Sequence, residues 1–95
     1  RFNLSKTGVV FAALLRDAKS KKLIGMPRLS PYGLLYRTGE SADVVREEGE
    51  ARLREVYEGA VQQPDLEDVI RLEMRRFFKR RVSHKPAVIP LILDV

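Results

Sequence analysis

The sequence predicts a two-layer α/β sandwich of the α+β type, in which two antiparallel helices cover one face of a sheet of about three strands. Residues 9–16 and 85–95 are strongly apolar, and a proline inside the second segment disfavours a helix there. Between them, residues 41–61 and 64–81 carry apolar side chains at the three- and four-residue spacing of amphipathic helices. The short connection between these helices makes them antiparallel neighbours. With a further strand after residue 22, the order is strand, strand, helix, helix, strand.

The first strand is expected at Val9–Arg16, which is rich in β-branched and apolar residues without alternation. This composition is typical of a central strand covered on both faces. The polar residues Arg1–Thr7 before it are expected to be the end of a linker, and residues 8–95 to form a single α/β domain. Because the chain begins with arginine rather than methionine, we expect it to be part of a longer protein.

A second strand is expected at Leu23–Met26, after a polar turn. Pro27 and Pro31 have no backbone N–H to donate, so this strand should lie at an edge of the sheet or be broken near Ser30. The segment Tyr32–Tyr36 is either its continuation after a kink or a third short strand.

The first helix is predicted to begin after Ser41, a good N-cap residue. Its buried stripe is expected to contain Val45, Gly49, Leu53, Val56, Tyr57, Ala60 and Val61. Gly49 in this stripe costs about 1 kcal/mol relative to alanine, which predicts that another part of the backbone approaches it closely.

The second helix is predicted to begin at Pro64–Asp68, where Asp65 and Asp68 resemble a capping box. Its buried stripe is expected to contain Leu66, Val69, Ile70, Met74 and Phe77. The last strand should then pair with Val9–Arg16. The sheet face opposite the helices would remain partly apolar and would need a partner.

The composition and motifs argue against an active site in this chain. There is no P-loop or dinucleotide-binding glycine motif, and no cysteine. The only histidine, His84, lies beside Lys85 in a polar connection and is expected to be solvated. We therefore expect no catalytic residue, no metal site and no cofactor. The longest apolar run is far below the ~20 residues that span a bilayer, and the lack of cysteine suits a cytoplasmic protein.

A basic ridge at the end of the second helix is the one candidate for ligand contact. The net charge is +5 over residues 69–95 (seven Lys/Arg against two acids) and −7 over residues 38–68 (three against ten). The candidates for RNA or phosphate contact are Arg71, Arg75, Arg76, Lys79, Arg80, Arg81 and Lys85. The alternative interpretation is that these cations are favoured by the helix C-terminus and that Arg71 and Arg75 pair with acids of the first helix.

Several stretches together resemble the C-terminal domain of bacterial ribonuclease J. They are Gly8–Ala12, the segment Gly33-Leu34-Leu35-Tyr36-Arg37, and above all the run from Arg75-Arg76-Phe77-Phe78 to the ending Lys85–Val95. The resemblance covers nearly the whole chain. One departure is Ser30-Pro31-Tyr32-Gly33, where the family usually has Ser-Arg-Gly, so whether Arg28 or Arg37 takes the role of that arginine stays open.

The resemblance implies a parent enzyme that is a zinc-dependent ribonuclease. In this family a metallo-β-lactamase domain with a β-CASP insertion holds two zinc ions and degrades RNA from the 5′ end or cuts it internally. The small C-terminal domain has three strands and two helices and is associated with subunit association and with support of nuclease activity. None of the catalytic motif occurs in this sequence, so no catalytic residue is carried over.

We therefore predict a dimerisation domain that is not catalytic alone. The residues expected to make the self-contact are Val9, Phe11, Ala13, Leu15, Val88, Ile89, Leu91 and Leu93. The expected partners are a second copy and the catalytic domains of the parent chain, with RNA as a further candidate and no membrane. Two alternatives remain open, an independent RNA-binding module and an ACT-like regulatory domain whose small-molecule ligand would bind the loop Gly25–Gly33.

Overall fold

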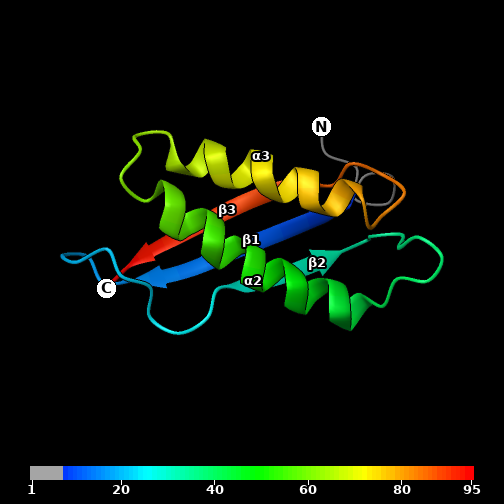
Figure 1. The fold of residues 1–95 in the computed structure, drawn as a ribbon, viewed down its shortest axis with the longest axis horizontal. Coiled ribbons are helices and arrows are strands. Elements are labelled where there is room, and N and C mark those ends of the chain that lie inside the picture. Colours follow the sequence, from blue (N-terminus) through cyan, green and yellow to red (C-terminus); the bar gives the residue numbers. More distant parts are fainter. Residues whose placement is uncertain (1–7) are drawn as a thin grey trace.

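The computed structural model describes residues 8–95 and confirms the predicted two-layer fold (Figure 1). In chain order, the elements are β1 (Val9–Arg16), β2 (Arg28–Tyr32), α2 (Ala42–Ala60), α3 (Leu66–Lys79) and β3 (Ala87–Asp94). In Figure 1 the two helices run in opposite directions and lie over the same face of the sheet. The expected linker, residues 1–7, lies outside the described residues.

The central strand of the sheet is β1, with β2 on one side and β3 on the other. β2 is antiparallel to β1, whereas β3 is parallel to it, from Val9 opposite Ala87 to Arg16 opposite Asp94. The two antiparallel helices return the chain to the end of the sheet where β1 begins, and for this reason β3 runs parallel to β1. The prediction that the last strand lies beside residues 9–16 is confirmed.

The second strand differs from the one expected. Residues 28–32 form β2, whereas Leu23 makes only an isolated bridge to Arg16. Pro27 lies between them and has no N–H, so the pairing with β1 is interrupted there and resumes in β2. The predicted edge position is confirmed, but the interruption comes before β2 rather than near Ser30.

Both edges of the sheet are poor in free backbone donors. On β2, the outward N–H of Leu29 donates to Oε2 of Glu50 in α2 at 3.0 Å. Because alternate N–H groups point to opposite sides of a strand, Pro31 occupies the next outward position. On β3, Ala87 donates its N–H toward the β1 side, so Pro90 falls at an outward position. Neither edge is therefore well suited to pairing with another strand.

Helix α2 begins as predicted, with the Ser41 side chain accepting a hydrogen bond from the N–H of Val44 at 3.5 Å. Its buried residues are Val45, Gly49, Leu53, Val56, Tyr57 and Ala60, and Val61 just after its end is half-buried. The spacing of these residues along the sequence therefore identified the face of α2 that covers the sheet.

Gly49 lies at the closest approach between α2 and its neighbours. A Cβ atom at this position would lie 2.6 Å from Cδ1 of Leu29 and 3.1 Å from Cε2 of Phe77. The neighbours are therefore side chains from β2 and α3, not another backbone as expected. The glycine lets those two side chains fill the space between α2, β2 and α3.

Alanine at Gly49 should stabilise the protein less than alanine at Gly59. Both glycines lie inside α2, so each replacement gains up to about 1 kcal/mol in helix propensity. At Gly59 a new Cβ meets nothing within 4 Å, whereas at Gly49 it displaces the Leu29 and Phe77 side chains. Urea denaturation should show Gly59→Ala to be more stable than Gly49→Ala by about 1 kcal/mol or more. Equal stabilities would contradict the tight contact at Gly49.

Helix α3 buries Leu66, Ile70, Met74 and Phe78, each four residues after the last. Phe78 is fully buried and Phe77 only half-buried, so the expectation that Phe77 belongs to the core stripe is corrected. Asp65 occupies the N-cap position, but its side chain makes no capping hydrogen bond. The predicted capping box is wrong, because Asp68 pairs with Arg71 instead.

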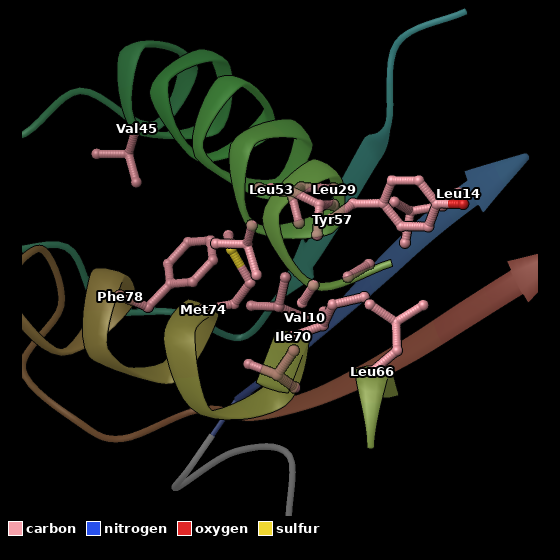
Figure 2. Packing of buried hydrophobic residues seen from close by; sticks show 14 of the residues in the cluster. Val10, Leu14, Leu29, Val45, Leu53, Tyr57, Leu66, Ile70, Met74 and Phe78 are labelled. Carbon is pink, nitrogen blue, oxygen red and sulfur yellow. The ribbon is translucent and has the colours of Figure 1, made fainter. Parts of the chain in front are cut away.

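The core lies between the helices and the sheet (Figure 2). In Figure 2, side chains of α2 and α3 meet the inner side chains of β1, among them Leu53, Met74, Phe78 and Val10. The described residues contain no buried charged side chain and no buried side-chain polar atom without a partner. The helices therefore cover the inner face of the sheet, and the candidate functional surfaces lie on the outside of the domain.

Candidate functional site

The outer face of the sheet, opposite the helices, is apolar. Because side chains alternate along a strand, Phe11, Ala13 and Leu15 of β1 point away from the core side chains Val10, Ala12 and Leu14. Their partners in register on β3 are Ile89, Leu91 and Leu93. Leu91 is 43% and Leu93 56% exposed. We call these six side chains the outer sheet face.

Two residues predicted for the self-contact are not available on this surface. Val88 is 3% exposed because it points toward the helices with its register partner Val10. Val9 lies on the outer side of β1 by alternation, but only 2% of it is exposed. The expectation that β1 is covered on both faces also fails within residues 8–95, since Leu15 remains 39% exposed.

Two further residues extend the outer sheet face and were missed in the sequence. The ring of Tyr32 in β2 contacts that of Phe11 edge to face, with 6.0 Å between centroids. Ile24 donates its N–H to the carbonyl of Leu15 at 2.7 Å, and its side chain is exposed. Both positions depend on the register between β1 and the chain after residue 22. That register could not be predicted, because the second strand was expected at Leu23–Met26 rather than at Arg28–Tyr32.

A polar network closes one end of the sheet on its helix side. Nε of Arg16 lies 2.6 Å from Oδ1 of Asp94, and its NH1 donates to the hydroxyl of Tyr57 at 3.4 Å. The hydrogen bond that Arg16 donates to Asp94 holds the pKa of Asp94 below its usual range and raises the pKa of Arg16. Tyr57 in turn donates its hydroxyl to the carbonyl of Lys21. Every member thus has a structural partner, so the network joins α2 to the ends of β1 and β3 and to the loop after β1 rather than forming a reactive site.

Three cations of the predicted basic ridge are held in ion pairs. Arg71 pairs with Asp68, and Arg76 pairs with Glu73 at 3.0 Å, both within α3. The third, Arg81, pairs with two acids, Glu40 and Glu48, and lies over the ring of Phe77. The pairing expected between Arg71 or Arg75 and the first helix is therefore wrong, because Arg71 finds its acid in its own helix.

The other four predicted cations, Arg75, Lys79, Arg80 and Lys85, make no ion pair within residues 8–95. The structure adds Arg37, whose NH2 donates to the backbone carbonyl of Lys79 at 3.3 Å. We call these five residues the basic cluster. No spacing in the sequence indicated that Arg37 belongs with them, because it lies 38 to 48 residues before them along the chain.

The segment carrying Arg37 is fixed against the chain that follows α3. Arg37 donates its N–H to the carbonyl of Arg81, and Ser83 donates its N–H to the carbonyl of Leu35, both at 2.9 Å. Between them, Tyr36 and Val82 form an isolated bridge, so the segment expected to extend the second strand pairs outside the sheet. Partial burial raises the pKa of Tyr36, with a smaller contribution from Asp43.

The residues required for a metal site or for a small-molecule loop are not brought together in the part of the chain that the structure describes. No three His, Asp or Glu side chains among residues 8–95 converge to hold a metal. Most of the segment Gly25–Gly33, the loop required by the regulatory alternative, is strand β2. A shallow hollow lies beside it, lined by Lys22, Leu23, Gly25, Met26, Arg54, Tyr57, Glu58 and Val61. None of the helices described here is long and apolar enough to cross a membrane.

Comparison with known proteins agrees with the resemblance seen in the sequence. The whole chain, residues 1–95, matches the family described as the ribonuclease J C-terminal domain. It is 27% identical over 100 residues to proteins named Ribonuclease J 2 from the Staphylococcus aureus strains NCTC 8325, MRSA252 and N315. The chain spans only 18% of the length of these relatives, and all of it is covered by the match. On the full-length family match, this chain belongs to the ribonuclease J C-terminal domain family.

Proposed function

We propose that this chain is the assembly domain of a cytoplasmic ribonuclease, and that it joins two protomers through the outer sheet face. The observation that supports the proposal is the row of exposed apolar side chains on β1 and β3, which no described residue covers. Single exposed apolar residues are common on proteins, but a contiguous set in register on neighbouring strands is typical of an interface.

The closed edges favour contact through the face over pairing through an edge. A dimer that extends the sheet needs a free row of N–H and C=O groups. On β2 that row is interrupted by Pro31 and by the hydrogen bond from Leu29 to Glu50, and on β3 by Pro90. Two sheets stacked face to face need no edge donors, and they bury the apolar side chains of both partners.

A second copy is the occupant that suits this surface best. A two-fold contact places the same patch on both protomers, so an apolar face meets an apolar face without charges to match. Burial of apolar area would supply the driving force, at roughly 25 cal/mol per Å² removed from water. The domain then acts by holding the catalytic parts of two parent chains near each other.

The chemistry of the parent is part of the same proposal. The relatives named ribonuclease suggest an RNA-cleaving parent, and the resemblance adds zinc-dependent cleavage from the 5′ end or internally. The residues described here supply no metal ligands in a group, so this chemistry would lie in a part of the parent outside this chain. The domain would support it indirectly, without a catalytic residue of its own.

The test is the oligomeric state of the 95-residue chain in solution. Sedimentation equilibrium should show a monomer–dimer equilibrium, and Leu91→Asp should raise the dimer dissociation constant at least about a hundredfold, because each interface would then bury two unpaired carboxylates. Leu72→Asp is the matched control. The exposed fraction of Leu72, 49%, is similar to the 43% of Leu91, but Leu72 lies on α3 on the helix side of the molecule.

The two variants distinguish the possible outcomes. A wild-type chain that stays monomeric at high concentration would contradict self-association through this domain alone. Equal weakening by Leu72→Asp and Leu91→Asp would place the contact elsewhere. Dimers that persist in Leu91→Asp but dissociate when the β3 edge is altered would favour edge pairing over the outer sheet face.

A further inference from the structure

The C-terminal end of α3 carries two adjoining hollows lined almost only by cations. One is lined by Leu72, Arg75, Arg76, Lys79 and Lys85. The other is lined by Arg37, Arg76, Lys79 and Arg80 alone. Because Arg76 and Lys79 line both, the hollows form one continuous basic surface around the end of the helix.

The positive charge of this surface is not neutralised by the described residues. Arg76 shares its acid Glu73 with Arg52 of α2, whose NH2 lies 3.2 Å from Glu73. The five cations of the basic cluster have no ion-pair partner there. The dipole of a helix places only about half a negative charge at its C-terminus, which offsets a small part of five positive charges. The helix end alone therefore does not account for the cluster.

Arg37 is positioned by the fold rather than by α3 itself. Its backbone N–H is bound to the carbonyl of Arg81, and one of its five guanidinium donors is bound to the carbonyl of Lys79. Among residues 8–95 nothing else accepts from this guanidinium, so its remaining donors can bind an anion. Figure 1 shows that the chain after β2 and the end of α3 lie at the same end of the molecule. The cluster thus combines cations from two distant segments in a fixed geometry.

We propose that the basic cluster binds the phosphate backbone of single-stranded RNA without reading its sequence. Phosphates suit Arg and Lys donors, and Arg75 and Lys79 lie about 6 Å apart along the helix axis, so neighbouring cations can follow a flexible strand. Within the part of the chain that the structure describes, the two aromatic rings of α3 contribute little to base stacking, because Phe78 is buried and Phe77 is covered by Arg81. The choice of RNA among polyanions rests on the ribonuclease parent proposed above.

The cluster and the outer sheet face can act at the same time. The outer sheet face lies on the side of the sheet away from the helices, and the cluster lies at the end of α3 in the helical layer. A dimer formed through the sheets would leave both basic surfaces exposed. Each protomer would then hold RNA independently of the other.

The experiment measures binding of a fluorescently labelled oligouridine to the 95-residue chain over a range of salt concentrations. Five phosphate contacts give a slope of log affinity against log salt of about −3.5, which is roughly a hundredfold loss from 50 to 200 mM salt. Arg75→Gln with Lys79→Gln should reduce the magnitude of this slope by about 1.4. The control, Arg54→Gln with Arg71→Gln, removes the same charge from two cations that are paired with Glu58 and Asp68. The control slope should stay within about 0.5 of the wild type.

Each other outcome would overturn the proposal. Equal slopes in the two double variants would show that only overall charge matters, and a several-fold preference for one base composition would show that bases are read. Polyglutamate that competes as well as polyuridine would assign the cluster to an acidic protein.

Circular dichroism melting checks that all variants fold. Leu91→Asp should keep the wild-type salt slope, so the RNA-binding proposal and the dimer proposal can fail separately. Loss of RNA binding in that variant would contradict a binding site within one protomer.

Discussion

Replacing Phe78 with alanine should lower the free energy of unfolding by about 3–5 kcal/mol, whereas the same change at Phe77 should cost about 1–2 kcal/mol. Phe78 is 0% exposed and belongs to the core between the helices and the sheet (Figure 2). Its removal leaves a cavity that the surrounding side chains of α2 and β1 cannot fully close. Phe77 is half-buried, and alanine there gives up contacts near Gly49 and beneath Arg81 without opening the core.

Phe77→Ala and Phe78→Ala are best compared by urea denaturation. The slope of the unfolding free energy against urea concentration should be the same in both variants and in the wild type. In a domain this small, a loss of 3–5 kcal/mol is a large share of the total stability, so Phe78→Ala should be partly unfolded at room temperature. Phe78→Leu serves as a control because it keeps much of the volume and should recover part of the loss. If Phe77→Ala proved the more damaging, the assignment of the α3 core face would be wrong.

The order of the elements and most of the core could be predicted because they depend on local patterns. The α2 stripe from Val45 to Ala60 and the α3 residues Leu66, Ile70 and Met74 follow helical spacing, which the sequence displays directly. The end of α3 could not be read this way. Phe77 and Phe78 are adjacent and equally apolar, and only the packing against the sheet decides which one is buried.

The second strand was misplaced for a related reason. Leu23–Met26 is more apolar than Arg28–Tyr32, so composition favoured the wrong segment. The structure uses the later segment because Leu29 and Pro31 face the helices, while Tyr32 packs against Phe11 on the other side. These contacts join distant parts of the chain and have no counterpart in local spacing.

The candidate surfaces were predicted in part. Alternation along a parallel strand separates Ile89, Leu91 and Leu93 from Val88, and the known period of two would have excluded Val88 from the self-contact. Which cations are free could be predicted only in part, because Asp68–Arg71 and Glu73–Arg76 are three residues apart within α3, whereas Arg81 pairs with acids far from it in the sequence. The position of Arg37 depends on tertiary pairing alone.

Gly8→Ala should lower the free energy of unfolding by about 2–5 kcal/mol, the second large effect expected in this chain. Gly8 precedes β1 with a φ of +72°, a left-handed conformation that costs about 1–2 kcal/mol for alanine. A Cβ there would also lie 2.9 Å from the carbonyl oxygen of Gly33 and 2.6 Å from Cδ2 of Leu34. Because a backbone atom cannot move aside as a side-chain end can, the crowding adds roughly 1–3 kcal/mol.

Gly25→Ala separates the two contributions. Gly25 has nearly the same φ, +71°, but a Cβ there meets nothing within 4 Å, so its cost should stay near the ~1–2 kcal/mol of the backbone conformation.

The crowding at Gly8 also has a functional consequence, since Gly33 and Leu34 lead directly into the segment that holds Arg37 over the end of α3. Gly8→Ala should therefore weaken oligouridine binding several-fold at a temperature where the variant is still folded, and Gly25→Ala should not. Equal unfolding costs for the two variants would show that Gly33 yields to the new side chain, and the expected displacement of Arg37 would then have no basis.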